Sequence, residues 1–200
     1  MATLSNIELR NIQTQILREN SVRKAVKKHI QSTFEDVQKQ FLKSFNEHPV
    51  TMEIEGGPTA GNISRTLNGV GNLFTYIGFS EGERPIDQLR KLLEKYEIQY
   101  HPHRNYITVS IIVPTKEEIF AATPVPWAAG RSWVRGIERG LSGLGQYLYK
   151  GRRIVKSKSG YAIQVRGKVR SGRFSNVKYI SSLLNDYYKA IKKIEDKRFL

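Results

Sequence analysis

Apolar residues recur every three or four positions between residues 22 and 45, which is the spacing of one face of an α-helix. Charged and polar residues fill the positions between them. Pro49 follows the run and forces the residue before it into an extended conformation. The sequence therefore predicts one long amphipathic helix, whose apolar positions are Val22, Val26, Ile30, Phe34, Val37, Phe41 and Phe45.

A second apolar pattern precedes this helix, over residues 4–17, and fits either another helix or an arm. The polar residues 18–21 separate the two patterns. Because this segment lies outside the main pattern, we expect it to contact a neighbouring molecule. The sequence predicts an arm over residues 1–21 and a single α+β domain over residues 22–200.

After Pro49 the period of the pattern changes. Residues 50–54 alternate apolar and polar side chains, which predicts a half-buried strand. Residues 56–72 contain five glycines, one proline and three asparagines, which is turn chemistry and predicts a long mobile loop. Glycine-rich loops can bind phosphate, but the P-loop motif is absent, so a flexible assembly loop is the preferred interpretation. Residues 73–79 predict a second strand.

Pro85 predicts the start of a helix, since proline is well tolerated in a first helical turn. Residues 98–100 and 106–113 predict two strands joined as a hairpin. The turn between them holds His101 and His103. A His-x-His pair can bind a metal ion, but an exposed pair in a turn is the preferred interpretation. The predicted helix buries Ile86, Leu89, Leu92, Leu93 and Tyr96.

The rest of the chain alternates between short elements and loops. Residues 116–122 predict a short helix, and residues 133–138 predict a strand because the glycines that follow disfavour a helix. Residues 154–168 predict a basic hairpin, and residues 177–194 a closing amphipathic helix. The fold class is α+β: a mostly antiparallel sheet flanked by long N-terminal and C-terminal helices, with extended glycine-rich loops.

The charge is large and unevenly distributed. The chain of 200 residues has a formal net charge of +15. Residues 1–130 contribute +1, whereas residues 131–200, the basic third, hold 18 Lys and Arg against 4 Asp and Glu and contribute +14. Such a concentration of charge favours a large anion as neighbour, nucleic acid above all, or an acidic protein surface.

Eight basic residues of this third are the candidate contacts to DNA or to a partner protein. They are spaced by glycine and serine and would neutralise phosphates without reading bases. Tyr147, Tyr149 and Tyr161 lie among them and could stack on bases or pack in a sheet. The eight residues are Arg152, Arg153, Lys156, Lys158, Arg166, Lys168, Arg170 and Arg173.

Few groups in the sequence suit catalysis. The chain has no cysteine, which excludes disulfides, thiolate ligands and cysteine nucleophiles. The G-x-S-x-G motif is absent. Glu53 and Glu55 would share one strand face and could form an acid pair, although a solvated strand face is the preferred interpretation. Glu138 is the only acid of the basic third before Asp186. Nucleases with two metal ions need several converging carboxylates, so we expect no enzyme, no metal and no cofactor.

Membrane association is not expected either. The sequence has no run of about 18 apolar residues, and its N-terminus lacks the basic and apolar regions of a secretory signal.

The order of these features resembles a bacteriophage virion protein of the head–tail joining or tail-completion type, the family of the lambda-like minor tail protein Z. A long helix ends in SFNEHPVTMEIEGGPTAGNIS, followed by NLFTYIGF and then RSWVRGIERGLSGLGQYL. In the last segment Trp133, Glu138 and Gly140 match the family's pattern aromatic-x-x-x-x-Glu-x-Gly. A basic hairpin and FSNVKYISSLLNDYYKAI complete the likeness.

The resemblance implies a structural protein whose copies close into a ring at the phage neck, most often a hexamer. It would complete the tail, join it to the head and contact other neck and tail proteins, with non-specific contact to packaged DNA. Its location would be the virion, after assembly in the host cytoplasm. The alternative from the charge alone is a sequence-independent nucleic-acid-binding protein, which a salt titration of DNA affinity distinguishes.

Overall fold

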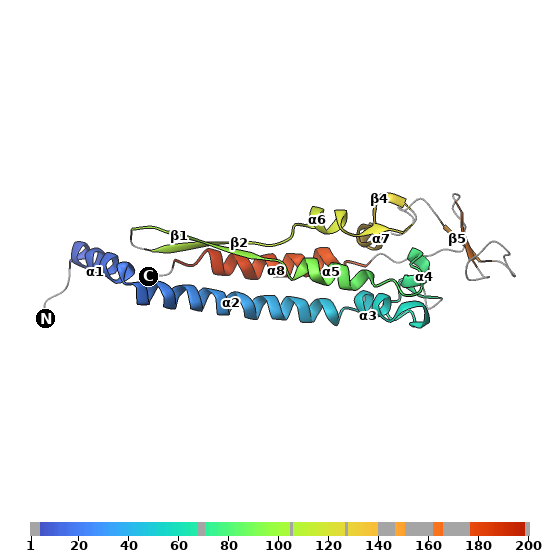
Figure 1. The fold of residues 1–200 in the computed structure, drawn as a ribbon, viewed down its shortest axis with the longest axis horizontal. Helices are drawn as coiled ribbons and strands as arrows, with labels where there is room; N and C mark the ends of the chain where they lie inside the picture. The colour runs from blue at the N-terminus through green and yellow to red at the C-terminus, as the bar shows by residue number, and fades with distance from the viewer. Residues whose placement is uncertain are drawn as a thin grey trace.

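The computed structural model describes residues 5–67, 71–104, 106–126, 128–139, 147–150, 162–165 and 177–198. The molecule is elongated, and its two long helices run side by side along the long axis (Figure 1). The elements are α1 (Asn6–Arg18), α2 (Asn20–Asn46), α3 (Pro49–Glu55), α4 (Leu73–Ile77), α5 (Pro85–Leu93), β1 (Glu97–Pro102), β2 (Ile107–Ile112), α6 (Lys116–Ala121), β3 (Pro124–Val125), β4 (Ala128–Ser132), α7 (Trp133–Arg139), β5 (Tyr147–Lys150), β6 (Ala162–Val165) and α8 (Ile180–Glu195).

The predicted α+β class is confirmed, with helices as the larger part. The described strands form three antiparallel two-stranded sheets, β1–β2, β3–β4 and β5–β6. Long helices stand near both ends of the chain, as the sequence predicts. The helices α2 and α8, rather than one continuous sheet, therefore form the framework of the fold.

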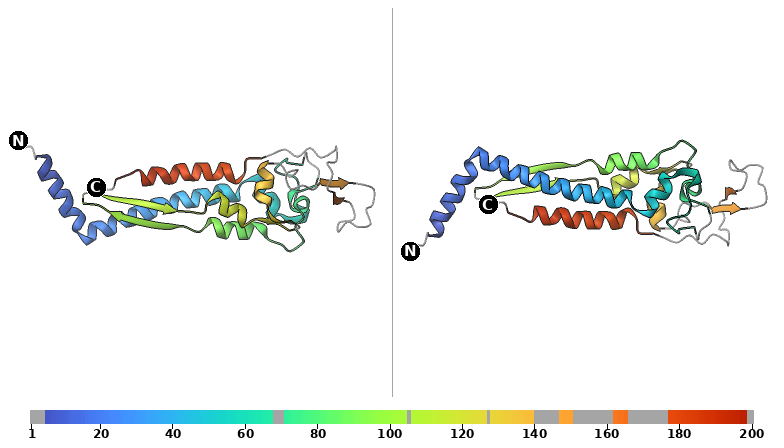
Figure 2. Two further views of the ribbon diagram at one scale, coloured as in Figure 1. Left: turned by 90° about the horizontal axis from the view of Figure 1, so that it is seen from above. Right: turned by 90° about the horizontal axis from the view of Figure 1, so that it is seen from below.

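The two N-terminal helices are separated where the sequence predicts a break. Ser5 begins α1 with a capping box, in which its hydroxyl accepts the N–H of Glu8 and the Glu8 carboxylate accepts the N–H of Ser5 at 2.7 Å. Glu19 is extended, with φ −67° and ψ 122°. The chain turns at this residue, so that α1 points away from the axis of α2 (Figure 2).

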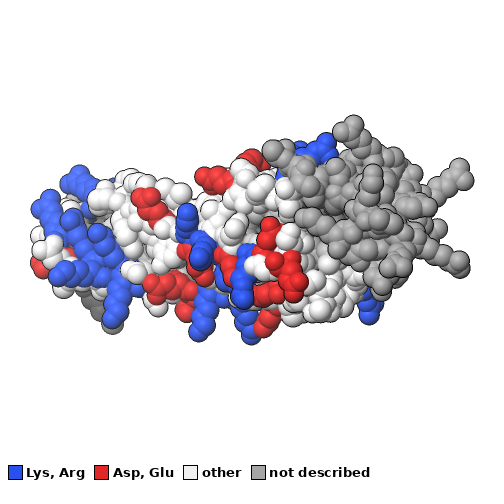
Figure 3. Space-filling model, turned by 45° about the vertical axis from the view of Figure 1, so that its right-hand side comes forward, with Lys and Arg blue, Asp and Glu red and all other residues white. Residues whose placement is uncertain are grey.

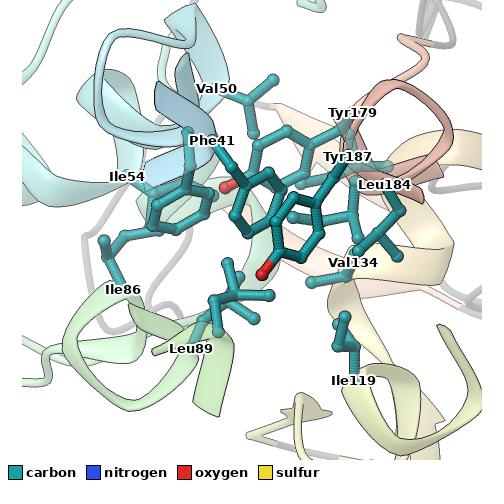
Figure 4. Packing of buried hydrophobic residues seen from close by; sticks show 14 of the residues in the cluster. Phe41, Val50, Ile54, Ile86, Leu89, Ile119, Val134, Tyr179, Leu184 and Tyr187 are labelled. Atoms are coloured by element: carbon teal, nitrogen blue, oxygen red, sulfur yellow. The ribbon is translucent and has the colours of Figure 1, made fainter. Parts of the chain in front are cut away.

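The apolar stripe of α2 forms the core, as predicted. Ile30, Phe34 and Phe45 are fully buried. The ring of Phe41 stacks on that of Tyr187 from α8, with centroids 4.2 Å apart and an interplanar angle of 11° (Figure 4). Stacked aromatic pairs contribute roughly 0.5–1.5 kcal/mol beyond the area they bury. The contact fixes α2 against α8 at the middle of the molecule.

A buried amide ties three helices together at the same level. The Gln38 side chain donates to the backbone carbonyl of Leu93, at the end of α5, at 2.9 Å. The Tyr187 hydroxyl donates to the side-chain carbonyl of Gln38. Buried polar groups are tolerated when they are hydrogen-bonded, and Gln38 is satisfied on both sides.

The predicted hairpin is confirmed, as are the helix that begins at Pro85, the short helix after Thr115 and the closing helix. β1 and β2 pair in the register Glu97 to Ile112 through Pro102 to Ile107. The side chains of β2 that face the core are Ile107, Val109 and Ile111. The Ile111 N–H donates to the Glu195 carboxylate at 2.7 Å, which joins β2 to the end of α8.

The strand predicted for residues 50–54 is wrong, because this segment is the helix α3. Pro49 occupies its first turn, and the N–H of Val50 donates to the Nδ1 atom of His48, the N-cap, at 3.2 Å. The alternation was misleading because Thr51 and Glu53 are buried, whereas Met52, one of the three apolar positions, is 41% exposed. The proline that ends one helix here begins the next.

The strands predicted for residues 73–79 and 133–138 are also wrong. Asn72 caps α4 by accepting the N–H of Thr75 at 2.9 Å, and Gly78 ends it with φ 95°, a left-handed conformation that glycine adopts readily. Residues 133–138 lie in α7, which starts directly after β4. A short apolar run is compatible with either a buried strand or a buried helix. Here the N-cap hydrogen bonds stabilise the helix.

Candidate functional site

The eight predicted contact residues fall within residues 151–161 and 166–176, outside the described residues, so their role stays a prediction. The backbones of β5 and β6, which precede and follow residues 151–161, pair antiparallel from Tyr147–Val165 to Lys150–Ala162. A hairpin pairing thus exists in the basic third, with its first strand earlier than the sequence predicts.

The helix α1 carries an apolar surface that the other described residues leave exposed. Leu9, Ile12 and Ile16 follow the three- and four-residue spacing of one helical face, which we call the arm face. Their exposed fractions are 44%, 41% and 40%. Ile7 is 72% exposed and lies on the opposite side of the helix. The arm face is available to a partner.

A groove opens between the two long helices. Its volume is about 320 Å³, and it is lined by apolar and polar side chains of α2 and α8. The stacked rings of Phe41 and Tyr187 border it, together with the half-buried Val37 and Leu183. Burial raises the pKa of the Tyr187 hydroxyl, so this group stays neutral and donates its hydrogen bond to Gln38 at every physiological pH.

Glu53 is the centre of a buried polar cluster that the sequence did not predict. Its side chain is fully buried. One carboxylate oxygen accepts the N–H of Leu73 at 2.7 Å and the side-chain amide of Asn62 at 2.8 Å, and the other accepts the N–H of Ser64 at 2.8 Å. The proposed strand pair of Glu53 and Glu55 is wrong, because Glu55 is exposed on α3.

The described part of the glycine-rich loop is tied to this carboxylate. The side chain of Asn62 also accepts the N–H of Leu67 at 3.1 Å. Asn72 donates to the backbone carbonyls of Pro58 at 2.7 Å and Ala60 at 3.0 Å. Residues 56–67 and 71–72 therefore form a hydrogen-bonded structure, in contrast to the mobile loop that the sequence predicts. The abundant asparagines are the signal that could have indicated this.

A second charged group links α3 to α5 at the surface. Arg90 contacts Glu55 at 2.7 Å and Asp87 at 2.8 Å. The hydrogen bond that Arg90 donates to Glu55 raises the pKa of Arg90, and the negative charge of both carboxylates acts in the same direction. Arg90 also donates to the side chain of Asn46 at 3.0 Å. These contacts bridge the end of α2, α3 and α5 and pair the carboxylates of Glu55 and Asp87 with Arg90.

The Glu138 side chain links α7 to α8 and α6. Its carboxylate accepts both the N–H and the hydroxyl of Ser181, each at 2.5 Å, and lies 3.7 Å from the ammonium of Lys116. It holds α7 against the start of α8 and close to α6. These contacts give Glu138 a structural role.

The histidines are dispersed. His48 is the N-cap of α3 and lies 4.8 Å from the ring of Tyr179. Burial lowers the pKa of His48. His101 and His103 are exposed on the hairpin, as the sequence predicts, and contact Ser110 and Thr108 at 3.2 and 3.1 Å.

The part of the chain that the structure describes contains no group of three or more His, Asp or Glu side chains arranged to hold a metal ion. Within the same residues, every helix is too short or too polar to cross a membrane. Comparison with known protein families, with curated proteins and with solved structures finds no match for this chain.

Proposed function

We propose that this chain is a structural virion protein that forms a ring at the neck of a bacteriophage, where it completes the tail and joins it to the head. Its partners are copies of itself and other neck and tail proteins, and its location is the virion after assembly in the host cytoplasm. Catalysis is not part of this role. The resemblance of the segments between residues 22 and 195 supplies the class of protein.

The arm face is the observation that carries the proposal. An isolated helix of about 13 residues is only marginally stable in water. After the extended residue Glu19, α1 points away from α2 (Figure 2). Leu9, Ile12 and Ile16 of α1 are exposed. A helix of this kind gains stability by packing on another molecule. When each copy gives its arm to the next, the contact is head to tail, and such contacts close into a ring when the rotation between neighbouring copies completes a full turn.

The experiment compares substitutions on the two sides of α1. Purified full-length protein is examined by negative-stain electron microscopy and light scattering. We expect closed rings for the unaltered chain. Ile12→Gln and Ile16→Gln should dissociate them, because each places a polar amide in the contact, whereas glutamine still favours a helix.

Ile7→Gln is the matched control. It makes the same chemical change on the same helix, but on the side away from the arm face, so the rings should persist. Rings that survive Ile12→Gln and Ile16→Gln, or a monodisperse monomer at all concentrations of the unaltered chain, would contradict the proposal. The decisive test in the parent phage is whether purified particles contain the chain.

The charge distribution favours a second candidate, a sequence-independent nucleic-acid-binding protein. The last 70 residues contribute +14 of the net charge of +15. Under this hypothesis the chain binds DNA as a monomer, the affinity falls steeply with salt, and neutralising the eight basic residues from Arg152 to Arg173 abolishes binding.

A further inference from the structure

Basic side chains from three distant segments meet at the end of the molecule opposite β5 and β6 (Figure 1). The first group lies on the first turns of α2, where Arg23, Lys24, Lys27 and Lys28 are all exposed. No acidic residue stands between Glu19 and Glu35. Residues 1–130 have a net charge of only +1, so their total does not reveal this local excess of positive charge.

The β1–β2 hairpin contributes Arg104 near the start of α2. The hydroxyl of Tyr100, on β1, lies 3.4 Å from the backbone carbonyl of Lys27, and the Lys27 ammonium lies 5.0 Å from the centre of the Tyr100 ring. The tip of the hairpin is therefore adjacent to the start of α2. Arg104 is exposed on this tip.

The third contribution comes from the chain beyond α8. The guanidinium of Arg198 lies 5.1 Å from the ring of Tyr106, at the other end of the hairpin turn. Arg198 is exposed. We call Arg23, Lys24, Lys27, Lys28, Arg104 and Arg198 the basic end.

Acidic groups are few here. Glu195 is half-buried, and its carboxylate already accepts the N–H of Ile111. Asp196 is exposed beside it, and Glu19 lies at the junction with α1. Figure 3 shows the contrast: blue side chains gather at the left end, whereas red and blue alternate over the middle. The six basic side chains therefore outnumber the three acidic ones, and this end carries a net positive charge.

We propose that the basic end is a binding surface for the phosphate backbone of nucleic acid, independent of sequence. This surface consists of other residues than the eight candidate contacts from Arg152 to Arg173, and it does not depend on the ring. Lys and Arg side chains at this density release counterions from a nucleic acid when they neutralise its phosphates, which supplies the binding free energy.

The composition of the surface favours nucleic acid over an acidic protein. Contacts between proteins are centred on apolar and aromatic side chains and are depleted in lysine. Half of the basic end is lysine, and the large exposed apolar residues of the described chain lie outside residues 20–29, 101–104 and 196–198. Interfaces with nucleic acid are more polar and far more positive. Tyr100 and Tyr106 face Lys27 and Arg198, so they are occupied with the protein's own cations, and contact with bases is not part of the proposal.

The test is a salt titration of binding to a fluorescein-labelled DNA duplex of mixed sequence, with the full chain. The variant Lys24→Gln/Lys28→Gln/Arg104→Gln removes three charges and keeps the two cations that contact tyrosine rings. Between about 50 and about 200 mM salt, the slope of log K against log salt should fall by about 2 to 3, with roughly tenfold or greater loss of affinity at the lower salt.

The matched control is Lys39→Gln/Lys91→Gln/Lys95→Gln. It removes the same charge from exposed positions along the middle of the molecule, and the slope should change by less than about 1. Both variants keep the eight basic residues of the last third, so their difference reports the basic end alone. Lys24→Arg/Lys28→Arg/Arg104→Lys keeps the charge and should bind like the unaltered chain.

Three results would overturn the proposal. The first is equal loss of affinity in the two glutamine variants, and the second is no binding of the duplex by the unaltered chain. The third is equal affinity for polyglutamate of the same charge, because that result would assign the surface to acidic proteins. None of them depends on ring formation, so the outcome is distinct from that of the proposed function.

Discussion

At the scale of single residues, Glu53 is the side chain on which most of the local order depends. A fully buried carboxylate is tolerated only when its oxygens are hydrogen-bonded, and Glu53 accepts three such bonds from two separate stretches of chain. The donors are two backbone amides and one side-chain amide, from Ser64, Leu73 and Asn62. The glycine-rich loop thereby closes over α3 and leads directly into α4.

Replacing this carboxylate by an amide should destabilise the protein. Glu53→Gln keeps one acceptor oxygen but turns an NH₂ group toward a donor, so that at least one buried N–H loses its partner. We expect the free energy of unfolding to fall by about 1.5–3 kcal/mol, measured by urea denaturation. Glu55→Gln is the control on the same helix. It removes an exposed pair with Arg90 and should lower stability by no more than about 1 kcal/mol. Equal effects of the two changes would contradict the role of Glu53.

At the scale of elements, the short helices are defined by the N-cap residue that precedes each of them. The N-cap of α3 is His48, whose unprotonated Nδ1 atom accepts the Val50 N–H at 3.2 Å. The N-cap of α4 is Asn72, and that of α6 is Thr115, which forms a capping box with Glu118. An N-cap contributes about 1 kcal/mol, which is decisive for helices as short as these.

The cap of α3 predicts a dependence of stability on pH. Burial lowers the pKa of His48 in the folded state, so the unfolded chain binds its proton first as the pH falls. The stabilisation by neutral His48 is complete above about 6.5, the ordinary pKa of histidine, and is lost as the pH falls through the lower pKa of the folded state. His48→Asn keeps an oxygen acceptor that does not titrate in this range. We expect urea denaturation between about pH 7.5 and pH 5 to show a smaller loss for the variant than for the unaltered chain. Identical pH dependence of the two proteins would contradict this prediction.

At the scale of the whole molecule, stability and assembly are carried by different parts. Burial is concentrated where α2 packs on α8, and buried residues of α3, α5, α6 and α7 complete this core (Figure 4). α1 lies outside this core, with Ile7, Leu9, Ile12 and Ile16 exposed. Segments with few buried contacts open at much lower free energy than the core.

Hydrogen exchange measured by mass spectrometry should separate the two parts. In dilute monomer, the amides of α1 should exchange much faster than those of residues 30–45 in α2, because little apolar area is lost when α1 unfolds. In the assembled ring, α1 should become protected and α2 should change little. Strong protection of α1 in the monomer would mean that the arm is held by its own chain, and the assembly proposal would then lose its support.

The parts of this protein that could be predicted from the sequence are those with long and regular patterns. Seven apolar positions define α2, and the break before it, the helix after Pro85, the hairpin and α8 were all predicted within a few residues. Residues 50–54, 73–79 and 133–138 were mistaken for strands, since a run of five to seven residues fits either period. Their caps, His48, Asn72 and Ser132, lie one residue before each helix, and the hydroxyl of Ser132 accepts the N–H of Arg135 at 3.1 Å.

The sequence by itself determined which faces of the long helices are buried, because the helical period is written in neighbouring residues and burial of those faces follows from the hydrophobic effect. Only the tertiary structure decided that Glu53 is an internal acceptor and that Lys27, Arg104 and Arg198 share one end. Charges and hydrogen-bond donors act through space, and Lys27 and Arg198, which share this end, are 171 positions apart in the chain. The charges of residues 1–130 sum to +1 along the sequence, whereas the fold gathers Lys27 and Arg104 at one end, together with Arg198 from the basic third.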